Sequence, residues 1–258
     1  MESPEFVLST LHHAPAGSPT PMLPRARYCI YRGMFAELPE NKHNDGPKNP
    51  RVFESDMPTF TTDVRTEKVQ DLFATGPGHG APGQAKGSGG GGAVEAVFWV
   101  KGKGLGQDKD IMVQWRRRGD AFLVAGDMEN EKEQSSGVRT VKSKVGERMR
   151  LVPGQDPSRW SWQREIDGQW GNLSPGMRGS FKNPIPGSKK SEHQPEPGQG
   201  IGLKSGPEDK EAKKNFRVVV IRPFEVEMLD LKDPANAKRF KHTFGDKEGQ
   251  WTTEELWP

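Results

Sequence analysis

The chain has 258 residues and a formal net charge of +3, and hydrophobic residues make up 31% of it. This length suffices for one large domain with its own core, and the 31 glycines and 22 prolines indicate long loops rather than a disordered chain. The small net charge does not by itself indicate a nucleic-acid partner. A single cysteine, Cys29, excludes an internal disulfide.

Membrane and export signals are the next features to test. No run of about 18 apolar residues occurs, and the N-terminus lacks a basic segment followed by an apolar stretch. The sequence therefore predicts neither a membrane span nor a signal peptide, and we expect a soluble, cytoplasmic protein.

The first predicted elements form a hairpin. Two strand-like runs, "FVLSTL" (6–11) and "RARYCIYRGM" (25–34), flank a turn rich in Pro, Gly and Ser. The next segment, 36–57, is polar and contains several prolines. It is predicted to be an inserted loop.

The stretch "FTTDVRTEKVQDLF" (60–73) changes its periodicity in the middle. Its first half favours a strand, and its second half has the i, i+3, i+4 spacing of a helix face, with Val69, Leu72 and Phe73. Arg65, Thr66 and Lys68 stand at the predicted helix start, where free N–H groups and the helix dipole favour an anion. The simpler alternative is that Thr66 caps the helix and the charges are solvated. The spacing alone leaves both open.

The glycine-rich tract "GPGHGAPGQAKGSGGGG" (76–92) is predicted to be a flexible linker. A phosphate loop would feed a helix and carry a Lys followed by Ser or Thr. This tract instead feeds the alternating strand "AVEAVFWVK" (93–101).

The rest of the chain is predicted to be strands separated by insertions at about 102–110, 127–140 and 187–214. Strands are expected at 111–126, at 216–231 and at the terminal "WTTEELWP", and a short helix within 141–152. About six strands without a repeating βαβ pattern predict one domain over 1–258 of the mainly β class, a small antiparallel barrel with flanking helices.

Residues for self-contained catalysis are not evident in this sequence. The six histidines lack metal-ligand spacing, and no nucleophile–base set emerges. We therefore expect no metal site, and any chemistry would belong to a bound cofactor.

Five motifs together suggest a family. In order, "RYCIYRG", "FTTDVRTEK", "QWRRRG", "LSPGMRGSF" and "NPIPG" resemble the pyridoxamine 5′-phosphate oxidase-like FMN-binding family. They are most similar to its branch with an Alr4036-type FMN-binding domain, in the loop-expanded form typical of fungi. The resemblance implies an FMN-binding split β-barrel with FMN as the cofactor. It also implies a homodimer with FMN at the subunit interface, and a small-molecule substrate.

The resemblance also implies which residues contact FMN. The phosphate group would be bound by Arg65, Thr66 and Lys68. The other cofactor-binding positions are Thr61 and Thr62, which line the flavin, Gln114 from a neighbouring strand, and Arg27, Ile30 and Arg32 from the preceding strand. Arg27 and Arg32 have opposite parity, so both serve one site only if their strand bends, ends or borders the dimer interface. A solvent-facing Arg32 is the alternative.

The reaction implied is oxidation of pyridoxamine or pyridoxine 5′-phosphate in vitamin B6 metabolism, by hydride transfer to flavin N5 with O2 as acceptor. Ser174, Arg178 and Ser180 lie in the segment that supplies substrate contacts in the family. Alternatively, Ser174 is a turn or cap residue and Arg178 forms a surface pair. The helix that usually precedes the family's first strand and its C-terminal aromatic and arginine substrate residues are not evident.

Two alternatives to this oxidase remain at this stage. One is a flavin-dependent reductase or oxidase of another small molecule. The other is a non-catalytic flavin-binding or RNA-binding module, for which aromatic residues beside basic clusters would be needed. Tyr28, Tyr31 and Trp115 stand beside such clusters.

Overall fold

The computed structural model describes residues 4–76, 87–103, 110–129, 135–193, 203–245 and 249–258. Its strands are β1 Glu5–His13, β2 Met22–Ile30, β3 Phe53–Glu54, β4 Thr59–Asp63, β5 Gly89–Lys103, β6 Asp110–Val124, β7 Arg150–Leu151, β8 Phe216–Asp230, β9 Lys238–Gly245 and β10 Gln250–Leu256. Its α-helices are α1 Glu67–Ala74, α2 Ser136–Lys144, α3 Trp162–Gly171, α4 Pro175–Ser180 and α5 Lys210–Lys214.

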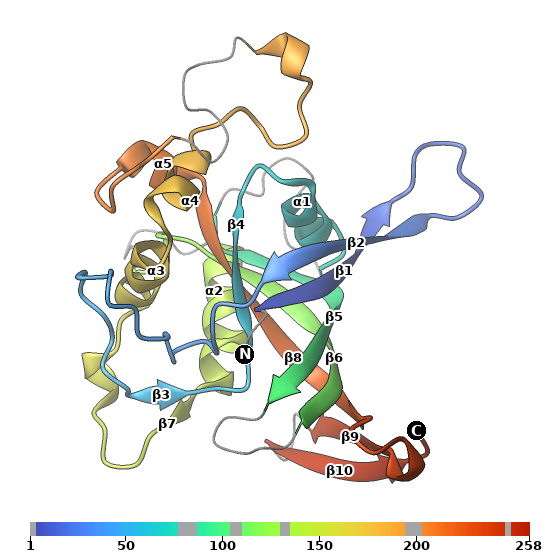
Figure 1. Ribbon diagram of the computed structural model, residues 1–258. Coiled ribbons are helices and arrows are strands. Elements are labelled where there is room, and N and C mark those ends of the chain that lie inside the picture. Colours follow the sequence, from blue (N-terminus) through green and yellow to red (C-terminus); the bar gives the residue numbers. More distant parts are fainter. Residues whose placement is uncertain (1–3, 77–86, 104–109, 130–134, 194–202, 246–248) are drawn as a thin grey trace.

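One curved antiparallel sheet organises the molecule (Figure 1). Its strand order is β10-β9-β8-β6-β5-β1-β2, and β4 pairs with the first part of β8. β4 pairs with the beginning of β8, and from Glu225 onward the same edge of β8 pairs with β9 instead. Between these two partners the pairing of β8 with β6 shifts register at Gly119. A bulge of this kind bends a sheet, and it coincides with the change of partner.

Two hydrophobic cores lie on opposite sides of β8. The first fills the barrel and is closed by α1, with Phe6, Leu8, Phe60, Leu72, Val219 and Ile221 among its buried residues. The second lies under α2, α3 and the α4–α5 region, with Val141, Trp170, Phe216, Val218 and Val220 among its buried residues. Because alternate residues of β8 enter different cores, the strand is apolar on both faces. This explains the uninterrupted run "VVVI" in its sequence.

The barrel is split between β2 and β4. After β2 ends, Arg32 N donates to Thr59 O and Thr59 N donates to Gly33 O, both at 2.9 Å. These two bonds join the two sides at one end. Further along, β4 pairs with β8 alone among the described strands, and α1 begins beside the opening.

The structure confirms the barrel and the first hairpin predicted from the sequence. β1 and β2 pair along their whole length, and the change from strand to helix after Phe60 occurs as β4 is followed by α1. Within the described residues, no helix is long and apolar enough to cross a membrane.

The glycine-rich tract differs from its prediction as a linker. Positions 77–86 lie outside the described residues, but Ser88 is buried and Gly89–Gly92 form the start of β5. A Cβ on Gly92 would lie 2.7 Å from Leu72 O. Glycine is therefore required there by the close approach of α1 to β5.

The other predicted insertions are partly structured. Segment 36–57 contains β3, which pairs with β7, and buries Val52 and Met57. α2 begins inside 127–140 and α5 ends inside 187–214. β5 and β6 extend into 102–110 from both sides, and positions 104–109, 130–134 and 194–202 lie outside the described residues.

Candidate functional site

The turn from β4 into α1 carries the candidate site. α1 forms because Val69, Leu72 and Phe73 all face the barrel core, and Thr66 occupies the N-cap position. The hydroxyl of Thr66 accepts no hydrogen bond from the helix N–H groups. Thr66 Oγ1 donates to Asp63 O at 2.8 Å. The capping interpretation is thus correct for the position and wrong for the side chain. Val69 N donates to Thr66 O at 3.1 Å, which leaves the N–H groups of Glu67 and Lys68 at the start of α1 for an anion.

Lys68 is the central cation of the site. Its Nζ lies 3.2 Å from Thr62 Oγ1 and 3.4 Å from Thr66 Oγ1, and within the described chain no carboxylate approaches it within ion-pair distance. Burial lowers the pKa of Lys68, while the nearby Cys29 raises it in part. An ammonium group that is half-buried and contacts only hydroxyl groups can still donate to an anion.

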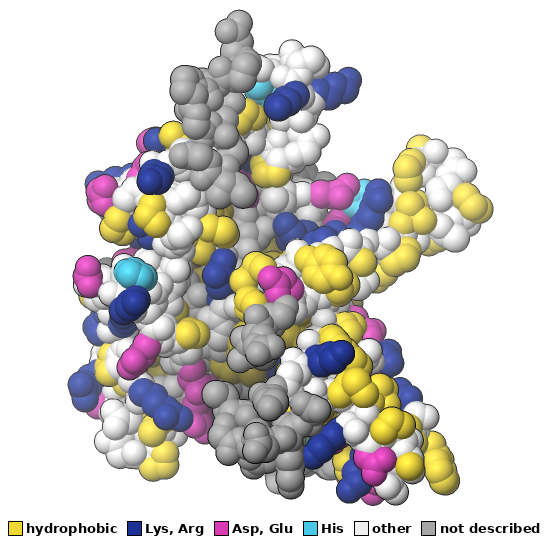
Figure 2. Space-filling view, in the orientation of Figure 1, with side chains coloured by type: hydrophobic (Ala, Val, Ile, Leu, Met, Phe, Trp, Pro, Cys, Tyr) yellow, Lys and Arg dark blue, Asp and Glu magenta, His cyan; other side chains and the backbone are white. Residues whose placement is uncertain are grey.

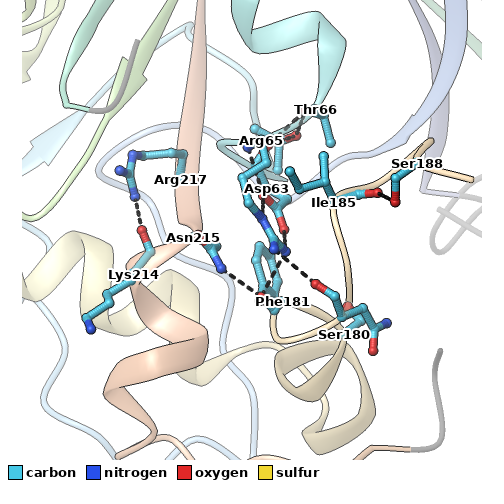
Figure 3. Close-up of polar contacts among 12 residues, drawn as sticks. Asp63, Arg65, Thr66, Ser180, Phe181, Ile185, Ser188, Lys214, Asn215 and Arg217 are labelled. Carbon is cyan, nitrogen blue, oxygen red and sulfur yellow. Dashed lines mark hydrogen bonds and ion pairs between the residues drawn. The ribbon is translucent and has the colours of Figure 1, made fainter. Parts of the chain in front are cut away.

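Arg65, predicted to bind the phosphate, is engaged by other groups of the chain in this structure. Its Nε and Nη2 donate to the Asp63 carboxylate at 2.9 and 2.6 Å. Nη2 and Nη1 also donate to the carbonyls of Phe181 and Asn183, at 3.0 and 2.9 Å. All but one of its N–H donors are thereby used. As Figure 3 shows, this side chain ties the β4–α1 turn to the segment after α4, so its role in this structure is architectural.

The structure brings Arg27 to the same opening as Lys68. Arg27 Nη1 donates to Thr10 Oγ1 at 2.7 Å, and the charge of Arg27 acts on the pKa of Lys68. In a regular strand Arg27 and Arg32 would point to opposite faces, but β2 ends at Ile30. Arg32 therefore lies beyond the regular strand, and its Nε is buried without a hydrogen-bond acceptor among the described residues.

Two residues predicted to contact the flavin, Thr61 and Gln114, lie on sheet faces that point away from Lys68. Thr61 and Thr62 are adjacent on β4 and point to opposite sides of the sheet, so only Thr62 reaches Lys68. Gln114 lies on the outer face of β6, opposite Trp99 of β5 and Leu229 of β8. Thr61 and Gln114 are therefore not part of the Lys68 cluster within one chain.

The three predicted substrate residues are engaged within the α4 region. Ser174 caps α4 by accepting from Met177 N, and Ser180 Oγ donates to Met177 O. Arg178 is buried and donates to the carbonyls of Ser205, Gly171 and Leu173. Their substrate role stays a prediction. The alternative for Ser174 as a cap is confirmed, and Arg178 is buried rather than paired at the surface.

Sequence reasoning missed the residues behind Arg27. Thr10 and Asp71 are buried, and Thr10 Oγ1 donates to Asp71 Oδ2 at 2.6 Å. His12 Nδ1 lies 2.7 Å from Asp71 Oδ1. The one available signal was Asp71 itself, a charged residue among the apolar positions of α1, whose partners on β1 lie about 60 positions earlier in the chain.

The fold and site together define a split β-barrel whose opening carries cations and hydroxyl groups beside a helix N-terminus. Residues 1–125 match the family described as pyridoxamine 5′-phosphate oxidase, FMN-binding domain. This part of the chain is thus similar to a pyridoxamine 5′-phosphate oxidase-like FMN-binding domain. The prediction of the family, and of FMN as its cofactor, is confirmed at that level.

A solved structure with a TM-score above 0.5 supports the same fold. A pyridoxamine 5′-phosphate oxidase-related, FMN-binding protein from Nostoc punctiforme PCC 73102 has a TM-score of 0.56 and 17% identity, covering 99% of this chain and 88% of its own. PhzG from Burkholderia lata 383, in complex with tetrahydrophenazine-1-carboxylic acid, has a TM-score of 0.46 and 13% identity, covering 100% and 84%. No curated protein matches the chain.

Proposed function

We propose that this protein binds FMN in the split between β2 and β4 and acts as an FMN-dependent oxidoreductase. The observation that carries the proposal is the position of Lys68. Its ammonium stands with two threonine hydroxyls at the start of α1, in the segment that matches an FMN-binding domain family.

The residues at the split fit a phosphate monoester. Lys68 supplies a cation, which the hydroxyls of Thr62 and Thr66 hold in place by accepting from it, and Glu67 and Lys68 at the start of α1 supply backbone N–H groups. The buried Nε of Arg32 lacks an acceptor among the described residues. This is the condition expected where a ligand would provide one. Arg65 is left out of the set because Asp63 occupies it.

Bound FMN would supply hydride acceptance at flavin N5. The residues of this chain would hold its phosphate and exclude water from the barrel side of the cleft, where Phe98, Phe6 and Tyr31 pack against one another. For the substrate we propose pyridoxamine or pyridoxine 5′-phosphate, with O2 as the final acceptor, on the support of the family resemblance. Oxidation or reduction of another small molecule is the alternative.

The RNA-binding alternative loses its main support. The basic motif "QWRRRG" would need free cations on one face. Arg116 and Arg118 are instead paired with Glu95 at 2.9 and 3.1 Å. Arg117 is largely buried beside the Phe98 ring. The motif therefore does not present a free basic surface.

We also propose that two copies form a homodimer through the outer face of the sheet. Tyr28 and Trp99 are 78% and 45% exposed there, and hydrophobic side chains are visible along the β1–β2 hairpin in Figure 2. Gln114 shares this outer face with Trp99. Because Gln114 and the Lys68 cluster lie on different faces of one chain, one flavin would meet both only if a second copy provides Gln114.

Binding of FMN is tested by absorption between about 350 and 500 nm and by co-elution with the protein on gel filtration. Wild type is expected to carry shifted flavin bands through the column. Lys68→Met should weaken FMN binding at least about tenfold, because a hydrogen bond to a charged group contributes about 1.5–3 kcal/mol.

A matched control for this experiment is Lys142→Met, an exposed lysine on α2, which should bind FMN like wild type. Pyridoxamine 5′-phosphate is then added under air to the FMN-loaded protein, and product is measured. Absence of co-eluting flavin from wild type would refute the proposal, and flavin binding without turnover would redirect the search to other substrates. The predicted cytoplasmic location stays a prediction.

A further inference from the structure

A buried carboxylate stands behind the cations of the split. The side chain of Asp71, on α1, is only 2% exposed. Its Oδ2 accepts from Thr10 Oγ1 at 2.6 Å and lies 3.4 Å from Arg27 Nη2. Its Oδ1 lies 2.7 Å from His12 Nδ1. One carboxylate oxygen of Asp71 thus faces Thr10 and Arg27, and the other faces His12.

The hydroxyl of Thr10 has only one orientation in this arrangement. A threonine hydroxyl has one proton to donate, and the carboxylate of Asp71 can only accept. Thr10 Oγ1 therefore donates to Asp71 and turns a lone pair toward Arg27 Nη1, which donates to it at 2.7 Å. Asp71 in this way fixes the guanidinium both directly and through the hydroxyl.

Electrostatics give the same carboxylate a second role. Burial is the main cause that lowers the pKa of Lys68, and the charge of Arg27 lowers the pKa further. Cys29, Asp63 and Asp71, in that order, raise the pKa. Arg27 and Lys68 are like charges that repel in a half-buried opening. Asp71, which pairs with Arg27, is one of the negative charges that offset this repulsion.

We propose that Asp71 and Thr10 are positioning residues, which hold Arg27 beside Lys68 and thereby set the preference of the site for phosphorylated over unphosphorylated flavin. This inference rests on the proposed function and deepens it. Neither residue touches the ligand. Their contribution is a guanidinium that is already ordered, so that less side-chain entropy is lost when a phosphate binds.

A buried carboxylate near a phosphate site could instead weaken FMN binding. If Asp71 simply competed with the phosphate for Arg27, its removal would free the guanidinium and strengthen FMN binding. The direction of the change in affinity therefore decides between positioning and competition.

The test measures dissociation constants for FMN and for riboflavin, which lacks the phosphate, by quenching of flavin fluorescence. Asp71→Asn keeps the shape and one acceptor oxygen, and Thr10→Val removes the hydroxyl while keeping a β-branched side chain. Each is expected to weaken FMN binding about tenfold, as loss of a residue behind a ligand-binding group typically does, and to change riboflavin binding less than about twofold.

Two further variants sharpen the result. Thr10→Ser retains the hydroxyl and should restore FMN affinity, a rescue that a purely packing role of Thr10 would not produce. His13→Gln, at an exposed position at the end of β1, is the control and should leave both affinities within about twofold of wild type. If Asp71→Asn fails to fold, the Thr10 pair alone decides.

Tighter FMN binding in Asp71→Asn, or equal losses for FMN and riboflavin, would overturn the positioning role. Unchanged FMN affinity in Thr10→Val and Asp71→Asn would overturn it too, while leaving the proposed function in place. If wild type binds no FMN, the proposed function fails, and the positioning role fails with it.

Discussion

Glu165 shows how one buried side chain can make stability depend on pH. It is 1% exposed on α3, and burial raises its pKa above the ordinary value of 4.5. Its hydrogen-bond donors are amides, from Asn49 and Gln169. The folded protein therefore holds a proton that the unfolded chain releases, in the window from pH 4.5 up to the raised folded value.

The sign of the effect follows from that proton. Because the folded state binds more protons in this window, the free energy of unfolding falls as pH rises through it. Glu165→Gln, which stays neutral, should match wild type near pH 4.5 and be more stable above the raised folded value, by about 1.4 kcal/mol for each unit of pKa shift. Urea unfolding across this range measures the difference.

The control for this prediction is Glu40→Gln, an exposed glutamate that lines one surface pocket together with Glu165. It should show the same difference from wild type at every pH. A constant offset for Glu165→Gln as well would contradict the assignment of the pH dependence to this carboxyl group.

At the same scale, the sequence predicted the site in part. Lys68, Thr66, Thr62 and Arg27 lie around one opening, as the resemblance implied. Arg65 was assigned to the phosphate because charge can be seen in a sequence, whereas its capture by Asp63 depends on the shape of the turn. The contact network behind Arg27 was not predictable, because it joins β1 to α1 across the fold.

Among the elements, strands were predicted better than helices. Alternation made β1, β2, β5 and β6 visible, and the run "VVVI" made β8 visible. α3 was missed because Gly168 and Gly171 weaken its helical pattern. Gly168 is explained by packing, since a Cβ there would lie 2.6 Å from the Leu38 side chain. β3 and β7 have two residues each, too few for any period.

The bulge between β6 and β8 makes a prediction at the scale of the element. A Cβ on Gly119 would lie 2.2 Å from Arg222 O and 2.8 Å from Pro223 Cα. Backbone atoms cannot yield as a flexible side chain can, so Gly119→Ala should destabilise the protein by at least about 1–3 kcal/mol. Thermal unfolding should show a decrease of ~2–4 °C per kcal/mol.

Gly126→Ala is the matched control, because the nearest atom to its Cβ would be Gln163 Oε1 at 3.7 Å. Its melting temperature should stay close to that of wild type. If both variants melt together with wild type, the sheet tolerates a side chain at the bulge, and the register shift has another cause.

For the whole molecule, the proposed dimer can be tested by complementation. Lys68→Met and Gln114→Ala proteins should each bind FMN weakly. If each flavin contacts Lys68 of one copy and Gln114 of the other, a mixed dimer contains one intact site and one doubly altered site. Mixing after reversible dissociation should then restore binding at about one FMN per mixed dimer.

FMN binding can be restored only if Lys68 and Gln114 of one site come from different copies. A site built within one chain would show no recovery of FMN binding on mixing. A second measurement addresses the interface itself. Tyr28→Glu with Trp99→Glu should shift the protein to monomers in analytical ultracentrifugation, because it places charge on the exposed apolar face. Trp257→Glu, at a 92% exposed position near the chain end, is the control and should leave the assembly unchanged.

The split barrel has one further consequence. β5 and β6 pair from Gly89–Leu123 to Lys103–Asp110. The β2 and β4 sides are joined at one end only within the described chain, by backbone bonds between 32–35 and 57–59. A ligand that spans this opening does the work of the missing sheet pairing. If FMN binds there as proposed, cofactor binding and closure of the barrel are thermodynamically linked, and the protein without its cofactor would unfold more readily.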